Sequence, residues 1–227
     1  MPKRIDEISL LRPAMSMKSI YLSTKHQPKS KVRFPIRAAP SARMNIASDA
    51  ELKLGGRMIL GLSPELHEGP EADFEPQTDE RSRVIMRARS RLETHGWVII
   101  SPGAQVIVAE GGSIELGQGH HSSPGSTIIC RSSVTLGGDG GISWGALVMD
   151  SNFHPIFKNE VPSSIDDPIT IGKHVFIGAR AIVLKGSTIG DGAIIAAGSV
   201  VSGEIPPNVL AGGVPAKVLQ ENVRWEW

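Results

Sequence analysis

A β-branched side chain recurs at every sixth position in one stretch near the end of the chain. The positions are Ile171, Ile177, Val183, Ile189, Ile195 and Val201. A second series, four residues further on, holds mostly small side chains: Val175, Ala181, Ser187, Ala193, Ser199 and Ile205. A period of six is neither that of a helix nor that of a simple alternating strand. It is typical of short strands joined by tight turns, with three strands to a coil of about 18 residues, so we predict a solenoid whose β-branched residues stack inside.

Weaker copies of this spacing lie upstream. Residues 130–148 keep the step of six and place Cys130 at a core position, where we expect a small, inward side chain. Looser series run through 98–116 and 42–60. Together they give about seven coils, and strands spaced about 4.8 Å apart make a column roughly 30 Å long. Aromatic residues are 4% of the chain and glycines number 25, which favours a core of small aliphatic side chains between many turns.

Segments without the rhythm divide the chain. Residues 1–35 carry eight Lys or Arg against two acids and predict a basic, flexible N-terminal arm. A solvated tail, a contact with a membrane surface and a contact with an acidic partner all remain open for it. The β-helix domain is expected over 36–206. Two excursions interrupt it, one at 63–95, where residues 81–92 suit a short helix, and one at 155–168, which contains three prolines.

The last segment, residues 207–227, has a different pattern. Pro206 and Pro207 end the rhythm, because proline cannot donate a hydrogen bond to a strand ladder. An extended stretch follows, and residues 218–225 suit a short closing helix. We expect that helix to cover the last coil, whose free strand edge would otherwise invite aggregation.

Length and charge exclude several classes of protein. The 227 residues fit one domain with a core of its own. A single cysteine excludes a disulfide framework and a multi-cysteine zinc site. The formal charge of +1 gives no general reason to expect nucleic-acid binding. No apolar run is long enough for a transmembrane helix, and none in the first 35 residues suits a signal peptide, so we expect a cytoplasmic protein.

Three longer motifs lie in the second half of the chain. The first runs from Ile142 to Pro155 as ISWGALVMDSNFHP, and the second from Ile171 to Gly186 as IGKHVFIGARAIVLKG. The third runs from Ala196 to Lys217. In combination they resemble the hexapeptide-repeat acyltransferases, in the branch of the sugar and polysaccharide O-acetyltransferases of the maltose/galactoside and capsule type. The resemblance implies an all-β fold, a left-handed parallel β-helix; the handedness comes from the resemblance alone.

The resemblance also implies a reaction. Members of the family transfer an acetyl group from acetyl-CoA (acetyl-coenzyme A) to a hydroxyl, here of a saccharide or glycan precursor, without a metal. His154 matches the family's catalytic histidine and is expected to act as general base while the hydroxyl attacks the thioester directly. Asp150 could orient that ring or bind acceptor hydroxyls, or it could simply hydrogen-bond its own turn. Asn152 and Trp144 are candidates for contacting the acceptor, with a turn position and core packing as their alternatives.

The implied coenzyme site lies along the later coils, between neighbouring chains of a homotrimer. Small residues there let the pantetheine arm lie against backbone amides, and a basic residue of the tail can meet a phosphate. The matching positions are Ala179, Ala197, Gly198, Ser202 and Lys217. Gly203 and Gln220 stand where the family often has basic residues, so the cations that bind the phosphates remain open, with Arg180 and Lys185 as further candidates.

Three other functions share features with this pattern. An acetyltransferase for antibiotics or other xenobiotics would differ only in its acceptor. A zinc hydratase of the γ-carbonic-anhydrase type uses a similar column but needs three histidines, two of them close in sequence, and His154 has no such neighbour. A scaffold protein would keep the repeat and need neither His154 nor a coenzyme groove.

Overall fold

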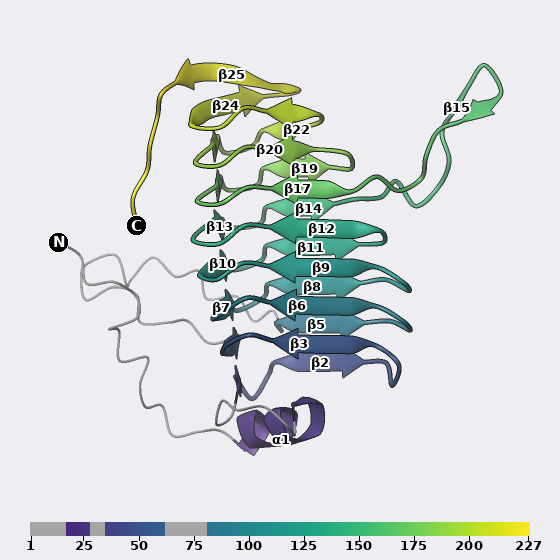
Figure 1. The fold of residues 1–227 in the computed structure, drawn as a ribbon, viewed down its shortest axis with the longest axis vertical. Coiled ribbons are helices and arrows are strands. Elements are labelled where there is room, and N and C mark those ends of the chain that lie inside the picture. Colours follow the sequence, from purple (N-terminus) through teal and green to yellow (C-terminus); the bar gives the residue numbers. More distant parts are fainter. Residues whose placement is uncertain (1–16, 28–34, 62–80) are drawn as a thin grey trace.

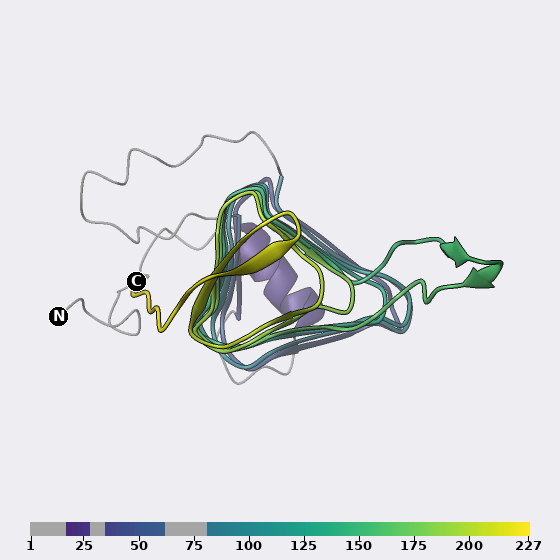
Figure 2. The ribbon, with the colours of Figure 1, turned by 90° about the horizontal axis from the view of Figure 1, so that it is seen from above.

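The chain folds as a column of stacked coils with a triangular cross-section (Figures 1 and 2). The computed structural model describes residues 17–27, 35–61 and 81–227. Successive strands pass from one sheet to the next and return to the first after three, so the column has three flat faces, which we call A, B and C. The prediction of an all-β parallel solenoid is therefore confirmed.

The strands of each face follow one another up the column. Face A holds β1 (Ile36–Ala38), β4 (Met58–Leu60), β7 (Val98–Ile100), β10 (His120–Ser122), β13 (Gly141–Ile142), β18 (Phe176–Ile177), β21 (Ile194–Ile195), β24 (Val209–Gly213) and β25 (Ala216–Glu221). Face B holds β2 (Arg43–Ile46), β5 (Arg83–Met86), β8 (Gln105–Val108), β11 (Thr127–Cys130), β14 (Leu147–Met149), β19 (Ile182–Leu184) and β22 (Val200–Val201). Face C holds β3 (Glu51–Leu54), β6 (Arg91–Thr94), β9 (Ser113–Leu116), β12 (Ser133–Leu136), β17 (Ile169–Ile171), β20 (Thr188–Ile189) and β23 (Glu204–Ile205).

The interior is a set of aliphatic files that run along the column. On face B the pairing register aligns Val106, Ile128, Val148 and Val183, and each is at most 1% exposed. Every member of the two six-residue series is buried, and so is Cys130, as predicted. Burying one such aliphatic side chain stabilises the fold by about 1.5–3 kcal/mol. The repeat of the sequence is thus the repeat of the core.

The corners between faces need backbone conformations that most residues avoid. At the corner between faces A and B, one residue in each coil from the third onward has a positive φ. These residues are Gly103 (73°), Gly125 (70°), Gly145 (64°), Arg180 (56°) and Gly198 (70°). Glycine adopts this conformation without steric cost, whereas Arg180 adopts it with a side chain. The corner between A and B therefore keeps its shape from coil to coil, and an arginine projects from one level of it.

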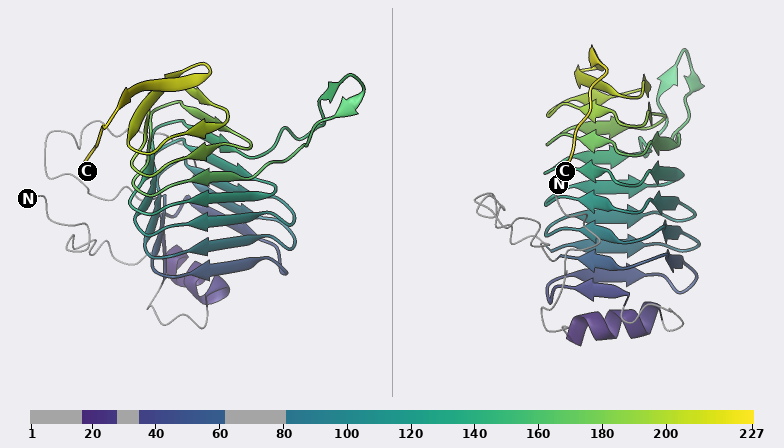
Figure 3. Two further views of the ribbon diagram at one scale, coloured as in Figure 1. Left: turned by 45° about the horizontal axis from the view of Figure 1, so that its top comes forward. Right: turned by 60° about the vertical axis from the view of Figure 1, so that its left-hand side comes forward.

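The first coil is covered by helix α1 (Met17–His26), which lies across the end of the column (Figures 1 and 3). The hydroxyls of Ser19 and Ser23 accept hydrogen bonds from the N–H groups of Ala38 and Ile36, at 3.0 and 3.1 Å. These N–H groups belong to the free edge of β1, so the helix satisfies donors that would otherwise be exposed. The prediction of a flexible arm over 1–35 is wrong for residues 17–26; residues 1–16 and 28–34 lie outside the described residues.

The predicted excursion at 63–95 is also too long. Residues 83–86 and 91–94 form β5 and β6 of the column, not a helix, and residues 62–80 lie outside the described residues. In these strands Val84 and Leu92 point inward and are fully buried, while Arg83 and Arg91 point outward. The arginines that favoured a charged helix are the outward-facing residues of strands in which inward and outward side chains alternate.

The chain ends in a hairpin and not in the predicted helix over 218–225. Strand β25 pairs antiparallel with β24 and covers the last edge of face A. A strand satisfies the hydrogen-bonding groups of that edge directly, which a helix lying on it would not. The chain then turns back along face A, where the Trp225 indole stacks on His174 with ring centroids 4.3 Å apart.

One hairpin leaves the column, in the segment where the sequence predicts an excursion at 155–168. Strands β15 (Phe157–Lys158) and β16 (Val161–Pro162) form its two antiparallel arms and project from the corner between faces B and C (Figures 1 and 2). Among the residues described, no helix combines the length and apolarity needed to cross a membrane.

Candidate active site

His154 lies at the base of the projecting hairpin, at the corner between faces B and C. The side chain is exposed, and its Nδ1 is 3.4 Å from the carbonyl oxygen of the next residue, Pro155. The residue before it, Phe153, has φ +63°, a conformation that costs a bulky residue energy and persists only where the surroundings enforce it. The backbone is thus strained at Phe153, directly before the residue that presents the imidazole to solvent.

A set of hydrogen bonds holds this strained loop in place. The N–H of Phe153 donates to the hydroxyl of Ser151 at 2.8 Å, and that hydroxyl donates in turn to Asp166. The Nε of Arg131, from the coil before, donates to Asp166 at 3.1 Å, and its guanidinium lies 5.5 Å from the centre of the Phe153 ring. The N–H of Asn152 donates to the carbonyl of Ile165 at 2.9 Å. Both ends of the hairpin are therefore tied together directly beneath His154.

Lys185 anchors the returning arm of the hairpin. Its ammonium donates to the carbonyl of Ser164 at 2.7 Å and forms an ion pair with Asp167. The hydrogen bond from Lys185 lowers the pKa of the Asp167 carboxyl, with a hydrogen bond from Ser164 adding to the effect. Lys185, a candidate phosphate ligand by sequence, is thus already engaged with the hairpin.

Asp150 does not orient His154. Its side chain is fully buried, and its two oxygens accept hydrogen bonds of 2.8 Å each from the backbone N–H groups of Arg131 and Ser132 in the preceding coil. The Sγ of buried Cys130 lies 3.5 Å from the same carboxylate, and burial, with that negative charge, raises the pKa of the thiol. These contacts match the structural alternative for Asp150, in which the carboxylate holds a corner of the coil together.

Trp144 and three predicted coenzyme contacts lie at a different corner, between faces A and B. Successive coils stack there: the N–H of Arg180 donates to the Trp144 carbonyl at 2.8 Å, and the N–H of Gly198 donates to the Ala179 carbonyl at 2.9 Å. Trp144 is 47% exposed, so core packing is not its role, and Ala197 and Gly198 are exposed above it. The result is a strip of small residues and backbone with an indole at one end.

The remaining predicted contacts are not in that strip. Ser202 lies exposed at the corner between B and C, one coil above Lys185, and Lys217 is exposed on β25. Within one chain, the structure therefore does not gather His154 with Trp144, nor all five predicted coenzyme positions with each other.

Face B separates these two corners, and sequence reasoning missed its character. Its outward side chains include at least one partly exposed aliphatic residue on every coil from the second upward. The aliphatic residues are Ile85, Ile107, Ile129, Leu147, Met149, Ile182, Leu184 and Val200. Face C instead presents charged and hydroxyl side chains such as Glu51, Arg91 and Thr170. The sequence does contain this pattern, because each of these aliphatic residues lies one position from an inward-facing residue. A search for the inward-facing residues alone does not detect it.

Comparison with known proteins identifies the family. A family model described as the hexapeptide repeat of succinyl-transferase matches residues 168–202. The galactoside O-acetyltransferase of Escherichia coli (strain K12) is 32% identical over 149 residues, which are 64% of this chain and 70% of that protein. The chain belongs to the hexapeptide-repeat acyltransferases. It is therefore an enzyme that transfers acyl groups.

Solved structures of low sequence identity share the fold. The polysialic acid O-acetyltransferase OatWY aligns with a TM-score of 0.60 at 17% identity, over 85% of this chain and 90% of that one. The polysialic acid-specific acetyltransferase NeuO aligns with a TM-score of 0.53 at 18% identity, over 86% of this chain and 90% of that one. At this identity the likeness supports the parallel β-helix and nothing finer.

Proposed function

We propose that this acyltransferase transfers an acetyl group from acetyl-CoA to a hydroxyl of a saccharide or glycan precursor. The observation that carries the proposal is His154, an exposed imidazole on a loop that is strained at Phe153 and tied down by Ser151, Asp166 and Arg131. The name of one relative supports the acetyl group, the bond and the class of acceptor, since that protein is an O-acetyltransferase of galactosides.

The proposed assembly is a homotrimer of left-handed columns that bury face B. Eight partly exposed aliphatic side chains at about 1 kcal/mol each give a gross gain of several kcal/mol per face. In a ring of three chains the interface is heterologous. One edge of face B in one chain therefore contacts the opposite edge of face B in the next chain. The corner between A and B of one chain then meets the corner between B and C of its neighbour. Trp144 and the strip of small residues of one chain would face His154 of the next.

In this arrangement the chain's own groups account for each step. The pantetheine arm lies on Ala179, Ala197 and Gly198, whose small size leaves room for it, and Arg180 and Lys217 are the cations proposed to meet its phosphates. Ser202 lies at the facing corner of the neighbour. A backbone N–H group of the strip other than those of Arg180 and Gly198, which already donate within the column, stabilises the oxyanion.

Neutral His154 takes the proton from the acceptor hydroxyl while that oxygen attacks the thioester carbonyl. Collapse of the tetrahedral intermediate breaks the C–S bond, and the imidazolium returns the proton to the departing thiolate. No acyl-enzyme forms. The proton that His154 takes from the acceptor hydroxyl is the one that it gives to the thiolate of coenzyme A. The Trp144 ring and the Asn152 amide are proposed to contact the sugar.

The test is acetyl transfer by the purified full chain, with saccharides and hydroxyl-bearing antibiotics as acceptors. Products are identified by mass spectrometry, and coenzyme A binding is measured by calorimetry. His154→Ala should lower turnover by about a hundredfold or more while the melting temperature and coenzyme A affinity stay unchanged. His95→Ala, which alters an exposed histidine on face C, is the matched control and should leave turnover unchanged.

Each alternative function predicts a different experimental result. Transfer to antibiotics but to no saccharide would overturn the acceptor class, and absence of coenzyme A binding would favour a scaffold. A loss of less than tenfold in His154→Ala would mean that another group is the base.

A further inference from the structure

Helix α1 presents a basic and aromatic surface away from the column. Leu22 and Ser23 are buried against β1, while Tyr21 is 55% exposed and Lys25 is exposed beside it. The Lys25 ammonium lies 5.4 Å from the centre of the Tyr21 ring, and Lys18 is partly exposed one helical turn before Tyr21. A tyrosine between two lysines on a helix that lies flat across the end of the molecule is the arrangement that suits a water–lipid boundary.

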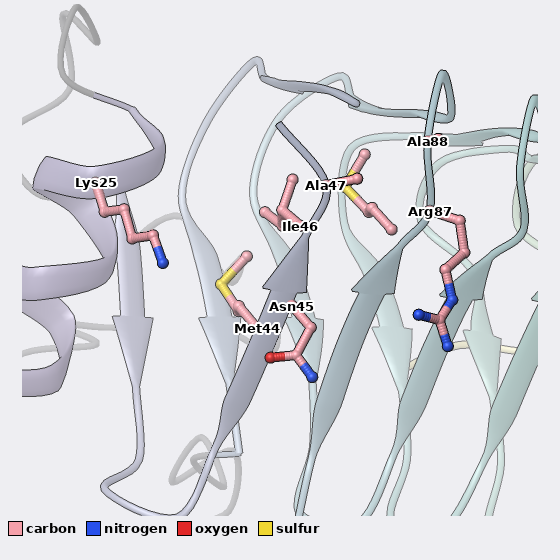
Figure 4. Close-up of a pocket in the computed structure, with 8 residues that line it drawn as sticks. Lys25, Met44, Asn45, Ile46, Ala47, Arg87 and Ala88 are labelled. Carbon is pink, nitrogen blue, oxygen red and sulfur yellow. The ribbon is translucent and has the colours of Figure 1, made fainter. Parts of the chain in front are cut away.

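A pocket opens at the same end, next to Lys25. Its volume is about 480 Å³, and it lies between α1 and the ends of β2 and β5 (Figure 4). The apolar lining residues are Met44, Ile46, Ala47, Met86 and Ala88. Lys25 and Arg87 also line it, together with Asn45, and none of the described residues that line it is acidic. The pocket therefore combines an apolar floor with positive charge, which fits an anionic amphiphile.

Further positive charge is gathered at this end. The outward residues of the first strands of face B include the exposed Arg43 and Arg83, before the aliphatic surface begins at Ile85. Each cation near a negatively charged bilayer contributes about 1 kcal/mol to binding.

We propose that the α1 end of the column is a docking surface for a membrane that contains acidic lipids. Lys18, Lys25 and Arg87 contact the headgroups, Tyr21 lies at the boundary, and the pocket takes the first part of an acyl chain. A polyanion without an apolar part would use the cations but neither Tyr21 nor the pocket, so the bilayer accounts for more of the surface. In the proposed trimer, and resting on it, parallel columns would present three such ends to one plane.

The test is co-sedimentation of the full chain with vesicles, so that the acids of residues 63–80 are also present. Vesicles of phosphatidylcholine alone are compared with vesicles that also contain phosphatidylglycerol, and only the latter should bind. The triple variant Lys18→Gln/Lys25→Gln/Arg87→Gln should bind about a hundredfold more weakly, since about 1 kcal/mol per cation is about a fivefold change.

A matched triple variant removes the same charge elsewhere. Lys158→Gln/Lys173→Gln/Arg224→Gln alters exposed cations of the hairpin, a corner of face C and the C-terminal tail, and should bind the vesicles as the wild type does. Tyr21→Ser should weaken vesicle binding severalfold but leave binding to polyglutamate unchanged. Circular dichroism confirms that each variant is folded.

Three results would overturn the proposal. The first is an absence of binding to phosphatidylglycerol vesicles. The second is an equal loss of affinity in both triple variants, which would indicate attraction without a defined surface. The third is a Tyr21→Ser variant that binds vesicles as the wild type does, which would reduce the surface to a general anion site.

Discussion

Replacing Asp150 with alanine should destabilise the column much more than it impairs the chemistry. The carboxylate is fully buried and accepts hydrogen bonds from the N–H groups of Arg131 and Ser132. Alanine leaves both donors without an acceptor in a partly buried corner. An unpaired buried donor costs about 1–3 kcal/mol, so the lower half of that range for each donor gives a loss of about 2–4 kcal/mol in the free energy of unfolding.

Asp191→Ala is the matched control. Its carboxylate accepts one hydrogen bond of 2.7 Å, from the N–H of Lys173, in an exposed turn where water can replace it. The expected loss is below about 1 kcal/mol. Urea unfolding at pH 7, followed by circular dichroism, compares the two variants. A difference of more than about 1 kcal/mol between them is the expected result.

The kinetic half of the comparison uses Asp150→Asn, which keeps one acceptor oxygen. Where this variant is folded, its turnover should stay within a few-fold of wild type, because Asp150 does not face His154. A partner in acid–base catalysis would instead be worth about a hundredfold or more. The structural assignment is refuted if Asp150→Ala is as stable as Asp191→Ala, or if folded Asp150→Asn loses that much turnover.

Face B, the column interior and the hairpin base each offer a further test. Ile129→Lys places a charge in the middle of face B and should give monomers in analytical ultracentrifugation with an unchanged circular dichroism spectrum; a retained trimer would mean that another face is buried. Burial, with the charge of His121 adding to it, lowers the pKa of His120 from 6.5 to about 3, so the folded state requires the neutral ring. The contribution of the neutral His120 ring to the free energy of unfolding is fully present above pH 6.5 and is lost as the pH falls toward 3. His120→Val, which copies Val98 one coil away, should flatten that part of the pH dependence of the urea midpoint, and an unchanged slope would contradict the assignment. Lys185→Ala removes the anchor of the returning hairpin arm, so proteolysis of the hairpin should become severalfold faster while the urea midpoint of the column barely changes; equal cleavage rates would show that the anchor is dispensable.

The interior of the column could be predicted from the sequence because each coil repeats one local rule. A β-branched residue at every sixth place must face the axis in every coil, so Ile177 and Val183 could be placed without knowing any contact. The ends of the column follow no such rule. Helix α1 is held by Ser19 and Ser23, whose hydroxyls bond to a strand edge 13 to 19 residues away, and a short polar helix carries no periodic sign of that.

The site was predicted in part, and the errors have one geometric cause. Residues six apart lie on neighbouring corners of a triangular coil, whereas residues about 18 apart lie on the same corner. Asp150 is four residues from His154 in sequence, yet its hydrogen bonds reach back 18 and 19 residues to the previous coil. Trp144 is ten residues from His154 but lies on another corner. Nearness along the chain therefore gave the wrong partners, while the motif around His154 identified an exposed, rigidly held imidazole.

A mixing experiment tests most directly whether one active site is shared between two chains. His154→Ala removes the base from one corner, and Ala197→Trp fills the strip at the other corner, so each variant alone should be inactive. When the two are co-expressed, some interfaces pair the intact His154 of one chain with the intact strip of the other. Random mixing should then restore about a quarter of wild-type acetyl transfer. Mixed trimers, verified by mass spectrometry, that show no more activity than the separate variants would contradict a shared site.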